Sequence, residues 1–351
     1  MNSEARIRRT SNPLVGWRVD PAAIRTTGHE LRRPECILAE RDGTLWTADA
    51  RGGVVRIAAD GSQRLITQTT DSYFDLNANM ERSLLQGTLP NGLAFARNGD
   101  ILIANFGTDA LELMTRDGLT RRLHDNIDGL PIGKVNFVLR DSRDRIWITV
   151  STRVNPWSDA INSTLSDGYI AVLDHRGLRV VADGFAFTNE IRFDAKEEWL
   201  YVAETTGKRV SRLRVGVDGS LFGRELYGPP SLGTGVVDGI AFDSFGNLWC
   251  AMIFADRLIA ITPDQEVLTL LDDGDPHATA KFEAEFATGR PVRFETMAAA
   301  GGTIAPWLAS VTFGGADLRT VYLGSLKGTT VPYFSSPVSG LPMLHWRQQD
   351  S

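Results

Sequence analysis

The chain has 351 residues, a formal net charge of −6 at pH 7 and 42% hydrophobic residues. This hydrophobic content is ordinary for a globular protein with a substantial core, and an all-β fold of this length can be a single domain. The acidic balance argues against general nucleic-acid binding, which needs a basic surface. Cys36 and Cys250 are the two cysteines, too few for a disulfide framework.

Residues 1–13 are predicted to be a flexible leader ahead of one folded domain, residues 14–346. The leader is polar, and no apolar region follows it as in a signal peptide. No apolar run approaches the roughly 20 residues that a membrane span requires. We therefore expect a cytoplasmic protein that acts on a small molecule, without nucleic-acid or membrane partners. The oligomeric state is left open.

One pattern recurs along the domain. A polar residue enters a short alternating strand, and a second strand begins at an apolar residue eleven positions later. The clearest copy runs from Val237-Asp238-Gly239 through a Gly-Asn turn to Trp249. The six copies pair Glu35 with Trp46, Asn91 with Leu102, Asn136 with Trp147, Asn189 with Leu200, Asp238 with Trp249 and, more weakly, Ser310 with Val321.

A second pair of strands follows each copy. The first pair spans residues 53–66 around Asp60-Gly61, a strong hairpin signal. A repeat of about four short strands in about 45–55 residues is typical of a propeller blade. The sequence predicts an all-β, six-bladed β-propeller with little helix, whereas a β-sandwich would leave the fixed polar residue unexplained. Residues 17–25 are predicted to add a strand to the last blade and so close the ring.

Three longer segments interrupt the repeats, at residues 68–89, 153–167 and 272–308. Loops of this length in a compact domain are usually functional or disordered. These three carry aromatic residues, among them Phe74, Trp157 and Trp307. We expect them to cover one face of the ring.

The first strand of every propeller blade lines the central channel, so the six polar residues are expected to form a ring around it. The ring contains two carboxylates, three amides and a hydroxyl, and no basic residue. Two buried carboxylates would repel each other and cost several kcal/mol unless neutralised. A divalent cation would neutralise them. Oxygen-only ligands favour Ca²⁺, then Mg²⁺, with Mn²⁺ and Zn²⁺ as further alternatives.

The competing interpretation is that these polar residues only cap turns. Asn91-Gly92 and Asp238-Gly239 are turn dipeptides in their own right. Of the six, Asn91 and Ser310 are expected to be the members least involved in metal binding. Cys36 is expected to be a core thiol, and Trp46, Trp147 and Trp249 to be packing residues.

Several segments of the repeats, together with Phe313–Tyr322 in the last repeat, resemble the senescence-marker-protein/gluconolactonase/luciferin-regenerating family. The resemblance extends over roughly residues 30–345. The segments of the repeats are Pro34-Glu35, Asn136, Thr188–Phe193, Tyr201–Thr205 and Asp238–Trp249. The resemblance implies a six-bladed propeller that holds one divalent metal, commonly calcium, in a central tunnel and acts on lactones. By the same resemblance, Glu35, Asn189 and Asp238 are metal ligands, and Asn136 contacts metal or substrate.

The sequence departs from the family after Asn136. Gluconolactonases typically have aspartate at the next position, where this chain has Phe137. That aspartate helps to bind sugar lactones, so its loss indicates a less polar substrate. An apolar mouth would suit such a substrate, and candidates for it are Phe74, Phe106, Trp157, Phe187 and Phe254.

The favoured hypothesis is metal-dependent hydrolysis of a lactone. A bound cation would polarise the carbonyl group and activate water. Asp238 would hold the metal and accept the proton of that water, while Asn91, Asn136, Phe137 and Trp157 would contact substrate. The alternatives are hydrolysis of a phosphotriester or fluorophosphate at the same metal, or a propeller that only binds a ligand, because one fold serves many functions.

Overall fold

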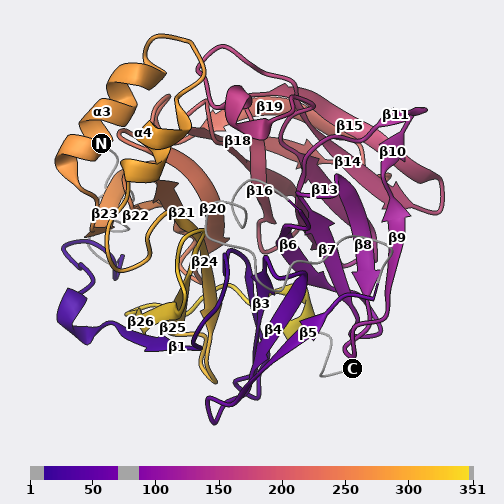
Figure 1. Ribbon diagram of the computed structural model, residues 1–351, viewed down its shortest axis with the longest axis horizontal. Helices are drawn as coiled ribbons and strands as arrows, with labels where there is room; N and C mark the ends of the chain where they lie inside the picture. Colours follow the sequence, from indigo (N-terminus) through magenta and orange to yellow (C-terminus); the bar gives the residue numbers. More distant parts are fainter. Residues whose placement is uncertain (1–11, 70–86, 348–351) are drawn as a thin grey trace.

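The computed structural model describes residues 12–69 and 87–347, and six four-stranded antiparallel sheets make up most of this part of the chain. Figure 1 shows the sheets following one another around a common axis, and the first strands of neighbouring sheets contact each other around the whole ring. The predicted six-bladed all-β propeller is therefore confirmed.

Five blades are built from consecutive strands. They are β2 (Ile37–Ala39), β3 (Leu45–Asp49), β4 (Gly53–Ile57) and β5 (Gln63–Thr67); β6 (Pro90–Phe95), β7 (Ile101–Asn105), β8 (Ala110–Met114) and β9 (Thr120–His124); β12 (Val135–Arg140), β13 (Ile146–Val150), β14 (Gly168–Asp174) and β15 (Gly177–Phe185); β16 (Thr188–Phe193), β17 (Trp199–Glu204), β18 (Arg209–Val215) and β19 (Leu221–Tyr227); and β20 (Val236–Phe242), β21 (Leu248–Ile253), β22 (Arg257–Ile261) and β23 (Val267–Asp272). A small hairpin, β10 (Asn126–Ile127) and β11 (Leu130–Pro131), follows the second blade.

The sixth blade joins the two ends of the domain. Its strands β24 (Leu308–Gly314), β25 (Thr320–Ser325) and β26 (Val331–Ser335) are completed by β1 (Arg25–Thr27), which pairs antiparallel with β26. The predicted closing strand is thus present. It begins only at Arg25, because a short 3-10 turn, η1 (Pro21–Ala23), precedes it. This N-terminal strand covers the edge of β26 and ties the two ends of the domain together.

The described part of the chain begins within the predicted leader, at Asn12. Asn12 is buried, and its Nδ2 donates to Asn247 Oδ1 at 2.6 Å. The remaining leader residues, 1–11, lie outside the described residues.

Three buried tryptophans fix the second strand of their blades to the preceding turn. Each indole Nε1 donates to a carboxylate six residues earlier in the chain. The pairs are Trp46 with Glu40 at 2.6 Å, Trp147 with Asp141 at 2.8 Å and Trp249 with Asp243 at 2.9 Å. The tryptophans are at most 1% exposed, so their predicted packing role is confirmed.

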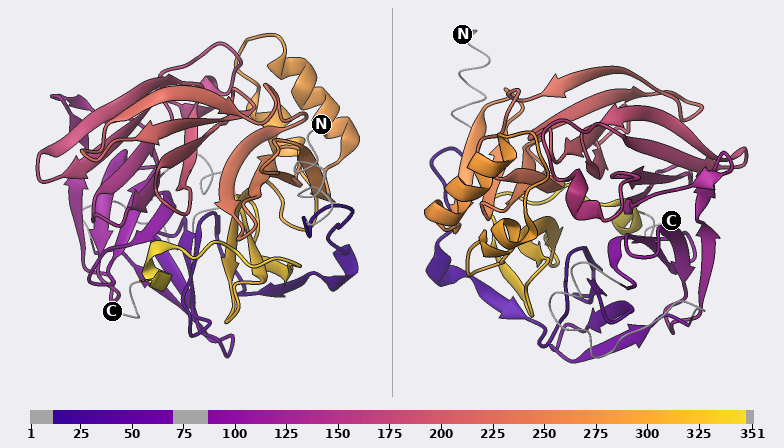
Figure 2. Two further views of the ribbon diagram at one scale, coloured as in Figure 1. Left: turned by 180° about the vertical axis from the view of Figure 1, so that it is seen from behind. Right: turned by 45° about the horizontal axis from the view of Figure 1, so that its top comes forward.

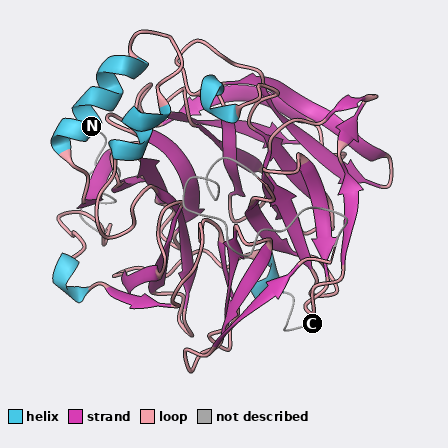
Figure 3. Cartoon of the chain, viewed as in Figure 1, coloured by secondary structure: helices cyan, strands magenta, loops and turns pink. Residues whose placement is uncertain are grey.

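Little helix is present in the described chain, and most of it lies on one side of the propeller (Figure 3). Helices α3 (Pro276–Phe286) and α4 (Phe294–Ala299) come from the segment after the fifth blade, and a 3-10 turn, η2 (Trp157–Ala160), comes from the third blade. The two segments meet where Val292 N donates to Ile161 O at 3.0 Å. They form the predicted cover, which we call the front of the ring. Most of the third predicted cover segment, 68–89, lies outside the described residues.

The opposite, rear end of the ring is crossed by the C-terminal segment. Residues 341–347 end in the single turn α5 (Leu344–Arg347), and the rear view in Figure 2 shows this yellow segment passing over the blades. Leu341 N donates to Phe242 O, and Trp346 Nε1 donates to Ala39 O, both at 2.8 Å. In the part of the chain that the structure describes, no helix has the length and apolar character needed to cross a membrane.

Candidate functional site

Bulges at the front ends of the inner strands aim the ring residues. The antiparallel register shifts between Pro90 and Leu93, Val135 and Phe137, Thr188 and Ile191, Val237 and Ile240, and Leu308 and Ser310. A bulge of this kind redirects side chains at a strand end. Asn91, Asn136, Asn189 and Asp238 lie at these bulges, and Glu35 stands just before β2.

The glycines that follow two ring residues do not form turns. Gly92 lies inside β6 and Gly239 inside β20. A Cβ atom at Gly92 would lie 2.6 Å from Phe137 Cα, and one at Gly239 would lie 2.5 Å from Ala309 O. These glycines are needed because adjacent inner strands approach closely. The turn-cap interpretation of the two dipeptides is therefore wrong.

Five of the six ring residues line one cavity. They are Glu35, Asn91, Asn136, Asn189 and Asp238. Ser310 is not among the lining residues, and its Oγ donates to the backbone oxygen of Glu35. Both ends of the Asn91 amide are engaged, because Oδ1 accepts from Arg33 Nη2 at 2.5 Å and Nδ2 donates to Asn136 O at 2.9 Å.

Burial makes negative charge costly in this cavity. It raises the pKa of Asp238 well above the usual range, and the neighbouring charges of Glu35 and Glu190 raise it further. Burial also raises the pKa of Glu35, although the Arg33 guanidinium opposes the shift. Burial raises the pKa of Glu190 to about 7. The described residues thus do not supply enough positive charge to neutralise these buried carboxylates.

Several buried acceptors of the ring lack a donor within the described structure. Asn136 Oδ1 and Asn189 Oδ1 accept no hydrogen bond there. Asn189 is held in place because its Nδ2 donates to Thr205 Oγ1 at 3.1 Å. Glu35 Oε2 has only an ion-pair contact, 2.8 Å from Arg33 Nη1, without hydrogen-bond geometry. Buried polar atoms normally have partners, so these oxygens indicate a ligand or cation.

Arg33 was not expected from the sequence, which placed no basic residue at the ring. It is 5% exposed, lines the cavity, and donates from Nη1 to Pro90 O at 3.2 Å. Arg33 lies two positions before Glu35, and its backbone has the left-handed conformation, with φ of 57°. Strand alternation alone does not reveal such a contact, because Arg33 precedes the strand.

A second charged pair was also missed. Glu190 is buried, and its Oε2 lies 2.7 Å from Arg192 Nη2. Simple alternation puts Glu190 on the face opposite Asn189. The bulge between Thr188 and Ile191 interrupts that alternation. The negative charge of Glu190 acts on Asp238 and raises the pKa of Asp238.

The outer part of the cavity is apolar. Its wall includes Phe106, Trp157, Phe187 and Phe254, so four of the five aromatic candidates line the cavity. The fifth candidate, Phe74, falls outside the described residues. Trp157 packs edge-on against Phe106, with ring centroids 5.9 Å apart, and its buried Nε1 has no acceptor in the described structure.

Phe137 does not lie in the cavity, which corrects its predicted contact with substrate. It is 1% exposed and belongs to the blade core, with the Arg192 guanidinium 4.5 Å from its ring centroid. The bulge between Val135 and Phe137 leaves Asn136 facing the cavity, while Phe137 is back in register opposite Thr149. Asn136 takes the tunnel face of β12, and Phe137 takes the other. Cys36 is likewise buried, as predicted for a core thiol.

No three His, Cys, Asp or Glu side chains of the described chain come together as a metal-binding group. The ring offers two carboxylates together with neutral amide oxygens instead. These features define a class of protein, a six-bladed propeller with a carboxylate and amide ring in an axial cavity. Residues 33–280 match the model of the SMP-30/gluconolactonase/LRE-like region, and the chain belongs to this family.

The relatives include one curated enzyme, 6-deoxy-6-sulfogluconolactonase of Pseudomonas putida. It is 29% identical over 184 residues, which are 50% of this chain and 53% of that protein, so the match spans about half of the relative's length. A gluconolactonase from Xanthomonas campestris has a TM-score of 0.63 at 18% identity, covering 90% of this chain and 89% of that one. A regucalcin from Agrobacterium tumefaciens str. C58, described as calcium-binding, has a TM-score of 0.62 at 15% identity, covering 90% and 92%. At these identities the two structures establish a shared fold.

Proposed function

We propose that this protein is a metal-dependent lactonase, which adds water across the acyl C–O bond of a cyclic ester and releases a hydroxy acid. The observation that carries the proposal is the set of ring oxygens without donors, Asn136 Oδ1, Asn189 Oδ1 and Glu35 Oε2, beside the buried Asp238. Membership of a family with gluconolactonases supports the reaction class.

The ring residues fit a hard divalent cation. Glu35 and Asp238 would supply the charge, and Asn189 and Asn136 would supply neutral oxygens. A ligand set made only of oxygens favours calcium over softer metals. A bound cation would lower the pKa of a water molecule and polarise the lactone carbonyl group. We propose Ca²⁺ as the ion, in agreement with the calcium-binding description of the regucalcin of the same fold.

The side chains around the ring would divide the remaining work. Asp238 would accept the proton of the attacking water, because its carboxylate faces the cavity. Asn136 would orient the lactone through its amide. Trp157 would donate from Nε1 to a substrate oxygen, since this buried donor has no acceptor within the described chain. The surrounding aromatic rings would exclude bulk water.

The wall of the cavity favours a lactone with an apolar body. Beside the four aromatic residues it contains Ile161, Ile253 and Leu326. Apart from Trp157 Nε1, these side chains offer no hydrogen bonds to the hydroxyl groups of a sugar lactone, and burying such groups without partners is costly. We therefore propose an aliphatic lactone as the preferred substrate.

Calorimetric titration of chelator-stripped protein with calcium tests the metal centre. The wild type and the exposed-site control Asp264→Ala should each bind one ion, whereas Glu35→Ala and Asp238→Ala should lose binding. Absence of binding in the wild type for calcium, magnesium, manganese and zinc would refute the metal centre.

Turnover is then compared for γ-decalactone and glucono-δ-lactone at saturating calcium. We expect kcat/KM for the aliphatic lactone to be higher by at least about tenfold, and activity to disappear in Asp238→Ala. The opposite preference would refute the proposed substrate class. A bound metal without turnover of any lactone would instead indicate a ligand-binding propeller.

A further inference from the structure

A second cavity lies at the rear end of the ring. The rear ends of β12, β16, β20 and β24 form one side, and the C-terminal segment forms the other. Much of its wall is apolar, and includes Leu139, Phe242, Phe313, Leu341 and Met343. No step of the proposed lactonase reaction uses this space.

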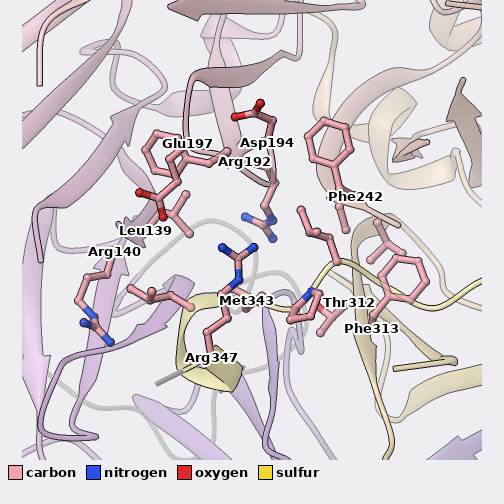
Figure 4. A pocket seen from close by; sticks show the side chains of 16 residues that line it. Leu139, Arg140, Arg192, Asp194, Glu197, Phe242, Thr312, Phe313, Met343 and Arg347 are labelled. Atoms are coloured by element: carbon pink, nitrogen blue, oxygen red, sulfur yellow. The ribbon is translucent and has the colours of Figure 1, made fainter. Parts of the chain in front are cut away.

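Two arginines converge in this cavity. Figure 4 shows the guanidinium groups of Arg192 and Arg347 pointing toward one another, while Arg140 points away. Arg192 is paired on its inner side with Glu190, and Arg140 lies 2.9 Å from Asp144. Arg347 donates to Ala195 O at 3.5 Å and has no carboxylate partner within the described residues.

The two acidic residues of the cavity, Asp194 and Glu197, form no ion pair with either arginine within the described residues, and both accept hydrogen bonds from other groups. Asp194 Oδ1 accepts from the backbone nitrogens of Glu198 and Trp199 at 2.8 and 3.0 Å. Glu197 Oε2 accepts from Ser142 Oγ at 2.6 Å. Glu190 balances the charge of Arg192, so it is Arg347 that has no carboxylate partner among the described residues. An anion between the two guanidinium groups would pair with Arg347.

We propose that the rear cavity is a binding site for a small organic carboxylate with an aliphatic body. The guanidinium groups of Arg192 and Arg347 would bind the carboxylate, a geometry for which guanidinium is well suited. The chain of the ligand would lie against Phe242, Phe313 and Met343. This site is independent of the proposed lactonase activity, because it lies at the other end of the ring.

The test is a calorimetric titration of the whole protein with octanoate, and with octan-1-ol as a neutral ligand of the same chain length. Arg347→Gln removes one guanidinium at an exposed position, so the fold should be retained. The matched control, Arg319→Gln, removes the same charge from an exposed residue outside the cavity lining.

We expect octanoate to bind the wild type and Arg319→Gln equally, and to bind Arg347→Gln about tenfold more weakly. Octan-1-ol should bind all three proteins more weakly than octanoate binds the wild type. Equal octanoate affinity in the two variants would overturn the proposal, because it would place binding elsewhere. Equal affinity for the alcohol and the carboxylate, or no saturable binding of octanoate, would also overturn it.

Discussion

Asp238 and Asp243 lie at the two ends of the same inner strand, and their surroundings differ sharply. Asp243, at the rear, accepts from Trp249 Nε1 at 2.9 Å, from Asn247 Nδ2 at 2.7 Å and from two backbone nitrogens. Asp238, at the front, faces Glu35 and amide oxygens without donors. Burial raises the pKa of both carboxyls. Burial alone therefore does not distinguish the two carboxyls. Asp243 is surrounded by hydrogen-bond donors, whereas Asp238 lies near the carboxylates of Glu35 and Glu190, whose charges raise its pKa further.

The largest effect on stability is expected from Asp243→Ala. The substitution leaves the Trp249 indole and the Asn247 amide without their acceptor, so the free energy of unfolding should fall by about 3 kcal/mol. Urea unfolding of chelator-treated protein measures this change. Calcium affinity should be retained, because Asp243 does not line the front cavity. A loss below about 0.5 kcal/mol would contradict a structural role for these bonds.

Asp238→Asn should shift stability in the opposite direction. It removes a buried charge that lies near the carboxylates of Glu35 and Glu190, so the metal-free protein should gain roughly 1–2 kcal/mol in the same urea experiment. The stabilisation that calcium gives to the wild type should be lost. A marked destabilisation of the metal-free variant would show that Asp238 has structural partners, as Asp243 does.

The sequence predicts the blades and the polar ring, but not every charged residue beside the ring. The eleven-residue spacing identified the blades, and the ring followed from it because equivalent positions in a propeller share a face. It did not identify Arg33, which reaches the ring from outside any strand, or Glu190, which depends on a bulge. Tertiary geometry determines both. The spacing of six between Glu40 and Trp46, repeated between Asp141 and Trp147 and between Asp243 and Trp249, is a sequence signal for the hydrogen bonds that fix the second strands of these blades.

A smaller effect is expected from Trp157→Phe at the front. The ring is kept and only the Nε1 donor is lost, so KM for the preferred lactone should rise by up to tenfold while kcat changes little. Trp199→Phe is the matched control, because Trp199 stacks against Arg214 away from the cavity. Steady-state kinetics of both variants would show the difference. An unchanged KM in Trp157→Phe would remove this residue from the substrate contacts.

The smallest effect concerns His345 at the rear. Burial lowers its pKa to about 4, and Nε2 donates to Ala39 O at 2.8 Å. The folded state therefore binds this proton less readily than the unfolded chain, with its pKa of 6.5, and the stability contributed by neutral His345 is lost as the pH falls from about 6.5 toward 4. His345→Gln keeps a donor but does not titrate. Between pH 7 and 5.5 the wild type should lose about 1 kcal/mol more unfolding free energy than this variant. Parallel pH profiles from urea unfolding would mean that His345 binds its proton equally well in the folded and unfolded states, which would contradict the lowering of its pKa by burial.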